Sequence, residues 1–311
     1  MTEAVLLLGD ASADRLLGDA LAERFERMKL WEAPDPEALL RARGSEVIAA
    51  LTTTLDRTML DHLPNLRLIA VPGAGFEHVD VAIARQRGIT VANAGDAHSA
   101  DVADHAVALT LASIHRLPHM QTWVRDGEWA RAGSPERRHA LSAQRFGIVG
   151  LGNIGTAIAT RLTPFGGEIA WWAPHDKPAV WSRRNSLRDL AAWCTVLIVA
   201  TRGDADNLID AATIAAVGPN GLIVNITRGS VLGEDALIAA LRAGTLGHAA
   251  LDVFVEEPTP PARWRDVPNV ILSPHVAGVS KESIERLHDA AVRNLLTVLD
   301  GGEVVNEITE E

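Results

Sequence analysis

The sequence is poor in cysteine, which limits how the chain can be stabilised. Cys194 is the single cysteine among 311 residues, so no disulfide can form within the chain. Such scarcity is typical of proteins from a reducing compartment. Because Cys194 begins the apolar run 194–200, we interpret it as a buried structural thiol rather than a nucleophile.

The sequence also lacks an excess of basic residues and any long apolar run. Lys and Arg total 29 against 40 Asp and Glu, which gives a formal net charge of −11. That balance disfavours nucleic acid or an anionic membrane as the main partner. No apolar run reaches membrane-spanning length, and the one near the N-terminus is too short for a signal peptide and has no basic flank. We therefore expect a soluble, cytoplasmic protein without a membrane partner.

The length and the pattern of apolar residues indicate a two-domain α/β protein. The 311 residues, 47% hydrophobic and 22% charged, are typical of a globular chain with two domains. Short apolar strands alternate with amphipathic helices in two successive series, which predicts parallel sheets. We therefore predict two Rossmann-like domains of the α/β class, facing each other across a cleft.

The first series covers about 95 residues. Strands are expected at 5–8, 47–51, 66–71 and 90–92, and helices at 14–27, 37–43 and 56–62. The helix at 14–27 is predicted from Leu17, Leu21 and Phe25, which are spaced four apart. A long helix at 101–116 follows, with an alanine-rich surface that could pack on another subunit or simply on the core. The polar stretch 127–143 is expected to be a loop.

The second series holds the strongest motif in the chain. Strands are expected at 146–149, 168–172, 195–200, 222–226, 248–253 and 270–272, and helices at 156–162, 187–192, 210–217, 234–243 and 281–299. Between the first of these strands and the first helix, Gly150, Gly152 and Gly155 follow the spacing G-x-G-x-x-G. In that context the glycines allow a tight turn, close approach of a pyrophosphate and close helix packing, and the helix N-terminus favours phosphate. We therefore predict a dinucleotide site.

Polar residues follow three strands of the same predicted sheet. Arg228, Glu257 and His275 all fall on the carboxyl side of strands, the edge where open α/β sheets bind ligands. Reduction of a ketone needs a proton from an acid such as histidine, and a neighbouring carboxylate favours the charged histidine. An arginine can hold a substrate carboxylate by two parallel hydrogen bonds. Taken singly, each residue could also be structural or simply solvated.

Order and spacing of six segments resemble those of the D-isomer-specific 2-hydroxyacid dehydrogenases. The segments are VPGAGFEHVD (71–80), NAGDAHSADVADHAVALTLA (93–112), FGIVGLGNIG (146–155), VNITRGSVLGEDAL (224–237), HAALDVFVEEP (248–258) and SPHVAG (273–278). The resemblance covers nearly the whole chain. It implies an NAD(P)-dependent enzyme that reduces a small 2-oxo acid, such as glyoxylate or hydroxypyruvate, to the D-2-hydroxy acid.

The resemblance also implies roles for single residues. Arg228, Glu257 and His275 would be the catalytic residues, with His275 as the proton donor. The backbone around Ala74 and Gly75 would receive the substrate carboxylate together with Arg228. The cofactor would be held by the glycines and by Asn153, Ile154, Ala173, His175, Lys177, Thr201, Thr227 and Asp252. No metal site is expected.

The domain organisation follows from the same resemblance. A discontinuous, flavodoxin-like substrate domain would comprise residues 1–97 and 285–311, and a dinucleotide-binding domain residues 98–284. Family members are commonly dimers joined through the helix predicted here at 101–116, so a homodimer is expected.

The sequence departs from the NAD-using pattern at Ala173. An acidic residue usually stands at this strand end and bonds the ribose hydroxyls, but here Ala173 is followed by His175 and Lys177. We therefore expect NADP(H) to be preferred, with NAD(H) possible. Two other functions stay open: a phosphite dehydrogenase-like oxidoreductase, and a nucleotide-sensing protein like the corepressors of this fold.

Overall fold

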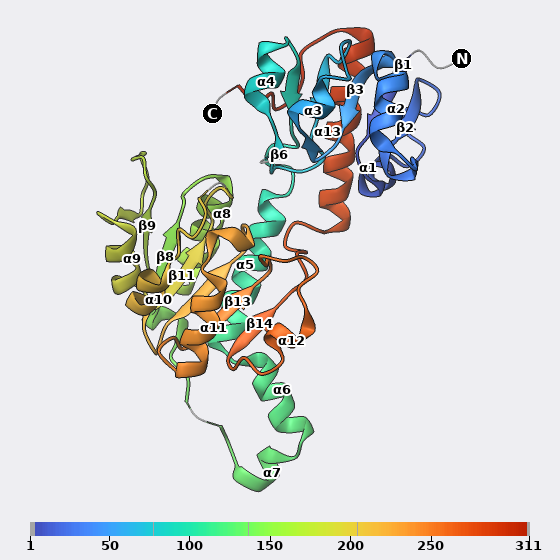
Figure 1. Cartoon of the computed structure of the whole chain (residues 1–311). Coiled ribbons are helices and arrows are strands. Elements are labelled where there is room, and N and C mark those ends of the chain that lie inside the picture. Colours follow the sequence, from blue (N-terminus) through green and yellow to red (C-terminus); the bar gives the residue numbers. More distant parts are fainter. Residues whose placement is uncertain (1–3, 77, 136, 204, 310–311) are drawn as a thin grey trace. The chain divides into compact units, whose positions relative to one another are not determined.

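The computed structural model describes residues 4–76, 78–135, 137–203 and 205–309 (Figure 1). Glu77, in the predicted substrate segment, and the outer ends of the predicted substrate domain lie outside the described residues. By its internal contacts the chain divides into a first unit, Met1–His98 with Val279–Glu311, and a second unit, Ser99–Gly278. The second division therefore falls before residue 285, and the whole of the last helix belongs to the first unit.

The first unit is a five-stranded parallel sheet in the order β2-β1-β3-β5-β7. Its strands are β1 (Ala4–Leu8), β2 (Phe25–Lys29), β3 (Val47–Leu51), β5 (Leu68–Ala70) and β7 (Thr90–Ala92), beside a separate pair, β4 (Thr54–Leu55) and β6 (His78–Val79). Its helices are α1 (Ala11–Leu17), α2 (Pro36–Arg43), α3 (Arg57–Leu60), α4 (Val81–Gln86) and α13 (Lys281–Asp300). Leu6 and Leu8 pack toward α1 and α13, whereas Leu7 packs toward α2, α3 and α4, so both faces are covered.

The second unit is a seven-stranded parallel sheet in the order β10-β9-β8-β11-β12-β13-β14. Its strands are β8 (Arg145–Val149), β9 (Glu168–Trp172), β10 (Ser182–Arg183), β11 (Val196–Val199), β12 (Leu222–Asn225), β13 (His248–Leu251) and β14 (Val270–Leu272). Its helices are α5 (Ser99–Ile114), α6 (Leu117–Arg125), α7 (Glu128–Ala132), α8 (Asn153–Leu162), α9 (Leu187–Trp193), α10 (Ala211–Val217), α11 (Glu234–Ala243) and α12 (Pro261–Trp264). Along β11, Val196 and Ile198 face α5 and α8, whereas Leu197 and Val199 face α9, α10 and α11. The predicted α/β class with parallel sheets is confirmed.

The strands of the second unit end level with one another. Residues paired across neighbouring strands at this end are Trp172, Val149, Val199, Asn225, Leu251 and Leu272, in that order across the sheet. All the strands are parallel, so the residues that come next in each segment emerge along one edge.

The helix predicted at 14–27 is wrong beyond Leu17. The structure ends α1 at Leu17, because Gly18 takes a positive φ of 51° and Leu21 one of 64°, which a helix does not allow. Phe25 then begins β2 and is 1% exposed. The four-residue spacing arose from two buried segments of different kinds and not from one helical face.

The loop predicted at 127–143 is wrong in part. It contains α7, and α6 precedes it, although no residue of either helix is buried. Leu117, Val124 and Trp129 on these helices are exposed large hydrophobic side chains. Among the described residues, α6 and α7 bury no side chain in a core, so their sequences need no regular apolar spacing.

Cys194 is buried in the second unit, as predicted. The thiol is 3% exposed and packs among side chains of α9 and the sheet. Burial raises the pKa of the Cys194 thiol to about 12, so it stays protonated at neutral pH. None of the described helices combines the length and the apolar character needed to cross a membrane.

Candidate active site

The three glycines between β8 and α8 each meet a different steric demand. Gly150 has a φ of +87°, and a Cβ there would lie 2.7 Å from the carbonyl oxygen of Ala200. A Cβ on Gly155 would lie 2.0 Å from the carbonyl oxygen of Gly150, so the helix packs directly against the turn. A Cβ on Gly152 would meet nothing within 4 Å. Gly152 therefore borders open space.

That open space suits the diphosphate of a dinucleotide. Gly152 is the N-cap of α8 and offers no side chain to the first N–H groups of the helix, which begins with Asn153 and Ile154. Those N–H groups and the positive end of the helix dipole attract phosphate. The residues of this turn therefore fit the predicted cofactor.

The remaining predicted cofactor residues emerge along the same edge. Ala173 directly follows β9, Thr227 follows β12 after Ile226, and Asp252 directly follows β13. Thr201 follows β11, and its Cα lies 2.8 Å from where a Cβ of Gly150 would stand. The structure brings these four strand ends to the edge that carries the glycine turn.

Two cationic side chains lie beside the end of β9. The Lys177 ammonium donates to the carbonyl of Leu151 inside the glycine turn. Arg183, on β10, donates through Nη2 to the carbonyl of Ala173 at 2.9 Å, and its guanidinium lies 5.7 Å from the centre of the Trp171 ring. His175 is exposed in the segment that connects β9 to β10. Arg183 was not among the predicted site residues, because the β9–β10 pairing that brings it to Ala173 cannot be seen from the residue order.

Arg228 is presented by a turn that Asn225 fixes. The Asn225 side chain is fully buried, and its Oδ1 accepts from the Thr227 N–H at 3.1 Å and from the Thr227 hydroxyl at 2.8 Å. Its Nδ2 donates to the Arg228 carbonyl at 3.0 Å. The half-buried Arg228 side chain donates through Nη1 to the Thr227 carbonyl at 2.8 Å. An asparagine side chain commonly bonds the backbone two residues further on, so an asparagine at a strand end could have identified Asn225 as a turn residue.

Glu257 and His275 are in direct contact. Glu257 Oε2 lies 2.6 Å from His275 Nδ1, and Glu257 Oε1 accepts from the N–H of Phe254 at 2.9 Å. The two side chains are 34% and 47% exposed, so the pair is open to a ligand. Because Nδ1 is held by the carboxylate, the ring of His275 is oriented.

Asp252 holds the turn that carries His275. His275 has a positive φ of 53°, and its N–H donates to the Asp252 carbonyl at 2.8 Å. The Asp252 carboxylate is fully buried and accepts from the Ser273 hydroxyl and from the N–H groups of Val276 and Ala277 at 2.6, 3.1 and 2.8 Å. These bonds offset the cost of burying its charge. Contact between Asp252 and the cofactor stays a prediction.

Gly229 brings the turn after β12 against the loop after β13. A Cβ on Gly229 would lie 1.9 Å from the carbonyl carbon of Phe254 and 2.3 Å from the nitrogen of Val255. Only glycine fits there, so the segment that carries Arg228 packs on the segment that leads to Glu257.

The predicted carboxylate site at Ala74 and Gly75 belongs to the first unit. Both residues follow β5 and are partly buried. The Ala74 carbonyl accepts from Asn93 Nδ2 at 2.7 Å, and Asn93 Oδ1 accepts from the N–H of Gly95 at 2.9 Å. The loop after β7 therefore fastens the Ala74 loop at the carboxyl edge of that sheet.

The contrast between Gly152 and Gly155 predicts two different defects. Gly155→Ala drives a methyl group into the Gly150 carbonyl and should lower the free energy of unfolding by about 1–3 kcal/mol. Gly152→Ala should unfold like the native chain, yet bind NADPH at least about tenfold more weakly, since the methyl fills the space for phosphate. Chemical denaturation and cofactor titration measure the two effects. Native cofactor affinity in Gly152→Ala would contradict the assignment of this turn.

Comparisons with known proteins agree with this geometry. Residues 107–277 match the family model described as "D-isomer specific 2-hydroxyacid dehydrogenase, NAD binding domain". A glyoxylate/hydroxypyruvate reductase A of Arabidopsis thaliana is 33% identical over 298 residues, covering 94% of this chain and 95% of that protein. A 2-ketogluconate reductase of Gluconobacter oxydans is 38% identical over 241 residues, covering 76% of this chain and 77% of that protein.

Solved structures give the same result. A 2-hydroxyacid dehydrogenase from Ketogulonicigenium vulgare superposes with a TM-score of 0.91 at 35% identity, covering 99% of each chain. An NADPH-dependent glyoxylate/hydroxypyruvate reductase from Sinorhizobium meliloti, in complex with NADP and malonate, superposes with a TM-score of 0.89 at 32% identity, covering 99% of this chain and 97% of that one. The family resemblance inferred from the six segments is confirmed: the chain belongs to the D-isomer-specific 2-hydroxyacid dehydrogenases.

Proposed function

We propose that the chain reduces a small 2-oxo acid, such as glyoxylate or hydroxypyruvate, to the D-2-hydroxy acid. The observation that carries this proposal is the 2.6 Å contact between Glu257 and His275, at the sheet edge that also carries the glycine turn. The relatives named glyoxylate/hydroxypyruvate and 2-ketogluconate reductases support the substrate class. None of these relatives favours phosphite oxidation or a corepressor-like role.

Each residue of the site has a distinct task in this reaction. A bound nicotinamide dinucleotide supplies the hydride. His275 gives a proton from Nε2 to the carbonyl oxygen, which would otherwise carry a full negative charge, and Glu257 holds the ring and balances its positive charge. Arg228 binds the substrate carboxylate and polarises the carbonyl.

Replacing His275 should remove the proton donor. His275→Ala is expected to lower kcat/KM for glyoxylate or hydroxypyruvate by about 10²–10⁴-fold, the usual worth of a general acid. Affinity for NADPH should change little, since the glycine turn is untouched. His288→Ala, on α13, is the matched control and should retain native activity. Retention of native kcat by His275→Ala would overturn the assignment, and activity with phosphite alone would overturn the substrate class.

We also propose that NADPH is the preferred cofactor. Ala173 stands where a carboxylate would repel a 2′-phosphate, and Arg183 bonds the Ala173 carbonyl at 2.9 Å. Lys177 reaches the glycine turn from the same segment. Asp176 lies 3.6 Å from Arg183 and partly offsets its charge. The Sinorhizobium meliloti relative, described as NADPH-dependent, supports the choice.

The cofactor proposal is tested by kcat/KM with NADPH and with NADH. The native enzyme should favour NADPH, and Arg183→Ala should lose about ten- to a hundredfold with NADPH alone, since it removes a charge-assisted bond to the phosphate. Ala173→Asp should shift preference toward NADH. Arg188→Ala, an exposed arginine on α9, controls for loss of surface charge. A native preference for NADH of tenfold or more would contradict the proposal.

We further propose a cytoplasmic homodimer joined through α5. One face of α5 is buried within the second unit, through residues such as Val102, Ala106 and Leu109. The other face presents small exposed residues, including Ala100 and Ala108. Just after it, Leu117, Val124 and Trp129 leave apolar surface exposed for a second copy to cover. The single buried cysteine suits the reducing cytoplasm.

A charge placed on the exposed face of α5 should separate the dimer. Ala108→Arg is expected to sediment as a monomer at concentrations where the native chain is a dimer, because it inserts an unpaired charge into the interface. Ala239→Arg, on the exposed face of α11, should sediment like the native chain. A native chain that is monomeric, or an Ala108→Arg variant that stays dimeric, would rule out this interface.

A further inference from the structure

The second unit contains a buried carboxylate that the proposed reaction does not use. Glu234 is the first residue of α11, and its side chain is only 6% exposed. Its Oε1 is paired with Arg263 Nε, and its Oε2 accepts from the N–H of Val255 at 3.1 Å. Buried ion pairs contribute little net stability compared with apolar residues of similar size. Stability alone is therefore a weak reason for a charge at this position.

The bond from Glu234 falls on the loop that carries Glu257. Val255 donates to Glu234, and its neighbour Phe254 donates to Glu257 Oε1 at 2.9 Å. Glu257 in turn holds His275 through Oε2 at 2.6 Å. Two consecutive N–H groups are thus fixed by two carboxylates, one buried and one at the active site.

The same loop is fixed from two further sides. The Phe254 ring packs edge-on against Trp264 of α12, with the ring centres 5.7 Å apart. The Phe254 carbonyl lies against Gly229, where a Cβ would stand 2.1 Å from its oxygen. Rotation of the Phe254–Val255 peptide is therefore restrained sterically, and Glu234 sets which way its N–H points.

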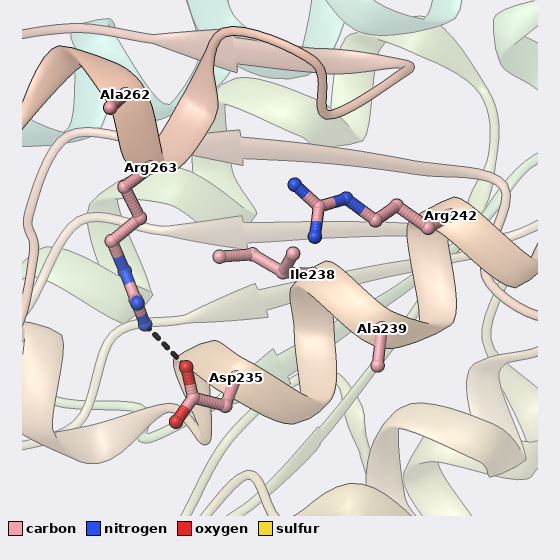
Figure 2. Close-up of a pocket in the computed structure, with 6 residues that line it drawn as sticks. All are labelled: Asp235, Ile238, Ala239, Arg242, Ala262 and Arg263. Atoms are coloured by element: carbon pink, nitrogen blue, oxygen red, sulfur yellow. Dashed lines mark hydrogen bonds and ion pairs between the residues drawn. The ribbon is translucent and has the colours of Figure 1, made fainter.

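Arg263 connects this buried carboxylate to the surface. Its Nη2 donates to Asp235 Oδ1 at 2.7 Å, as Figure 2 shows beside the open hollow between α11 and α12. The Asp235 side chain is 92% exposed, so its contact is screened by water, whereas that of Glu234 is not. Asp235 and Glu234 are thus neighbouring carboxylates on one arginine, and of the two only Glu234 is bonded to the Glu257 loop.

We propose that Glu234 is a positioning residue for the Glu257–His275 pair. It fixes the Val255 N–H, so that the adjacent Phe254 N–H faces Glu257 and holds its carboxylate against His275 Nδ1. Arg263 neutralises the buried charge and orients it. The proposal rests on the proposed function, in which Glu257 and His275 supply the proton.

A double-mutant cycle tests this role. Steady-state kcat and KM would be measured with NADPH and glyoxylate for the native chain, Glu234→Gln, Glu257→Gln and the double variant. Glu234→Gln should lower kcat by about tenfold and leave KM for glyoxylate within about threefold, because it misplaces the proton donor rather than the binding groups. In the Glu257→Gln background the same change should cost less than about twofold, since the group it positions is already lost.

Asp235→Asn is the matched control, because it removes the other carboxylate from Arg263 and should keep native kcat. Equal losses in both backgrounds, no loss in either, or a loss in Asp235→Asn as large as in Glu234→Gln would overturn the proposal. If Glu234→Gln does not fold, Arg263→Gln takes its place in the cycle with the same expected pattern. If the native chain turns over no 2-oxo acid, the proposed function fails. If the native chain reduces a 2-oxo acid and Glu257→Gln lowers kcat but Glu234→Gln does not, only the role of Glu234 fails.

Discussion

The register of the seven parallel strands is the constraint on which the site depends. Val149, Val199, Asn225, Leu251 and Leu272 are paired in one row, so each following residue emerges at one edge. A shift of one residue in any pairing would turn its core side chains toward the opposite face and move a functional group away from that edge. Each face of the sheet packs on its own set of helices. This packing fixes the register of the strands and therefore the positions of the residues that follow them.

Contacts of bare backbone add a second constraint, at a finer scale than the sheet. Gly155 lies against the Gly150 carbonyl, and Gly229 lies against the Phe254 carbonyl. In both places the approach is closer than any side chain allows, and in both it brings a functional turn against another segment. Gly155 in the glycine turn and Gly229 after Arg228 thus both allow two backbone segments to pack in contact. Only the glycines of the glycine turn form a motif that is recognisable in the sequence.

This difference explains what could be predicted from the sequence. Strand ends are visible as apolar runs followed by polar residues, so Arg228, Glu257 and His275 could be placed on one edge, and in the structure Glu257 contacts His275. The helix at 14–27 was wrong, because Leu17 and Phe25 share a spacing but belong to different elements. The roles of Arg183, Glu234 and Gly229 depend on pairings between distant segments, which the residue order does not specify.

Asp252, Glu234 and Glu257 differ in burial, and the difference suits different tasks. Asp252 and Glu234 are buried. Asp252 accepts from the N–H groups of Val276 and Ala277, and Glu234 accepts from the N–H of Val255, so each negative charge is satisfied while these segments keep their conformation. Glu257 is partly exposed and bonds His275, the side chain that we propose as the proton donor. A buried carboxylate with fixed partners has a high cost of rearrangement, whereas an exposed one can follow the charge of its histidine. The burial of Asp252 and Glu234 therefore favours rigid turns, whereas the exposure of Glu257 lets His275, the proposed proton donor, change its charge.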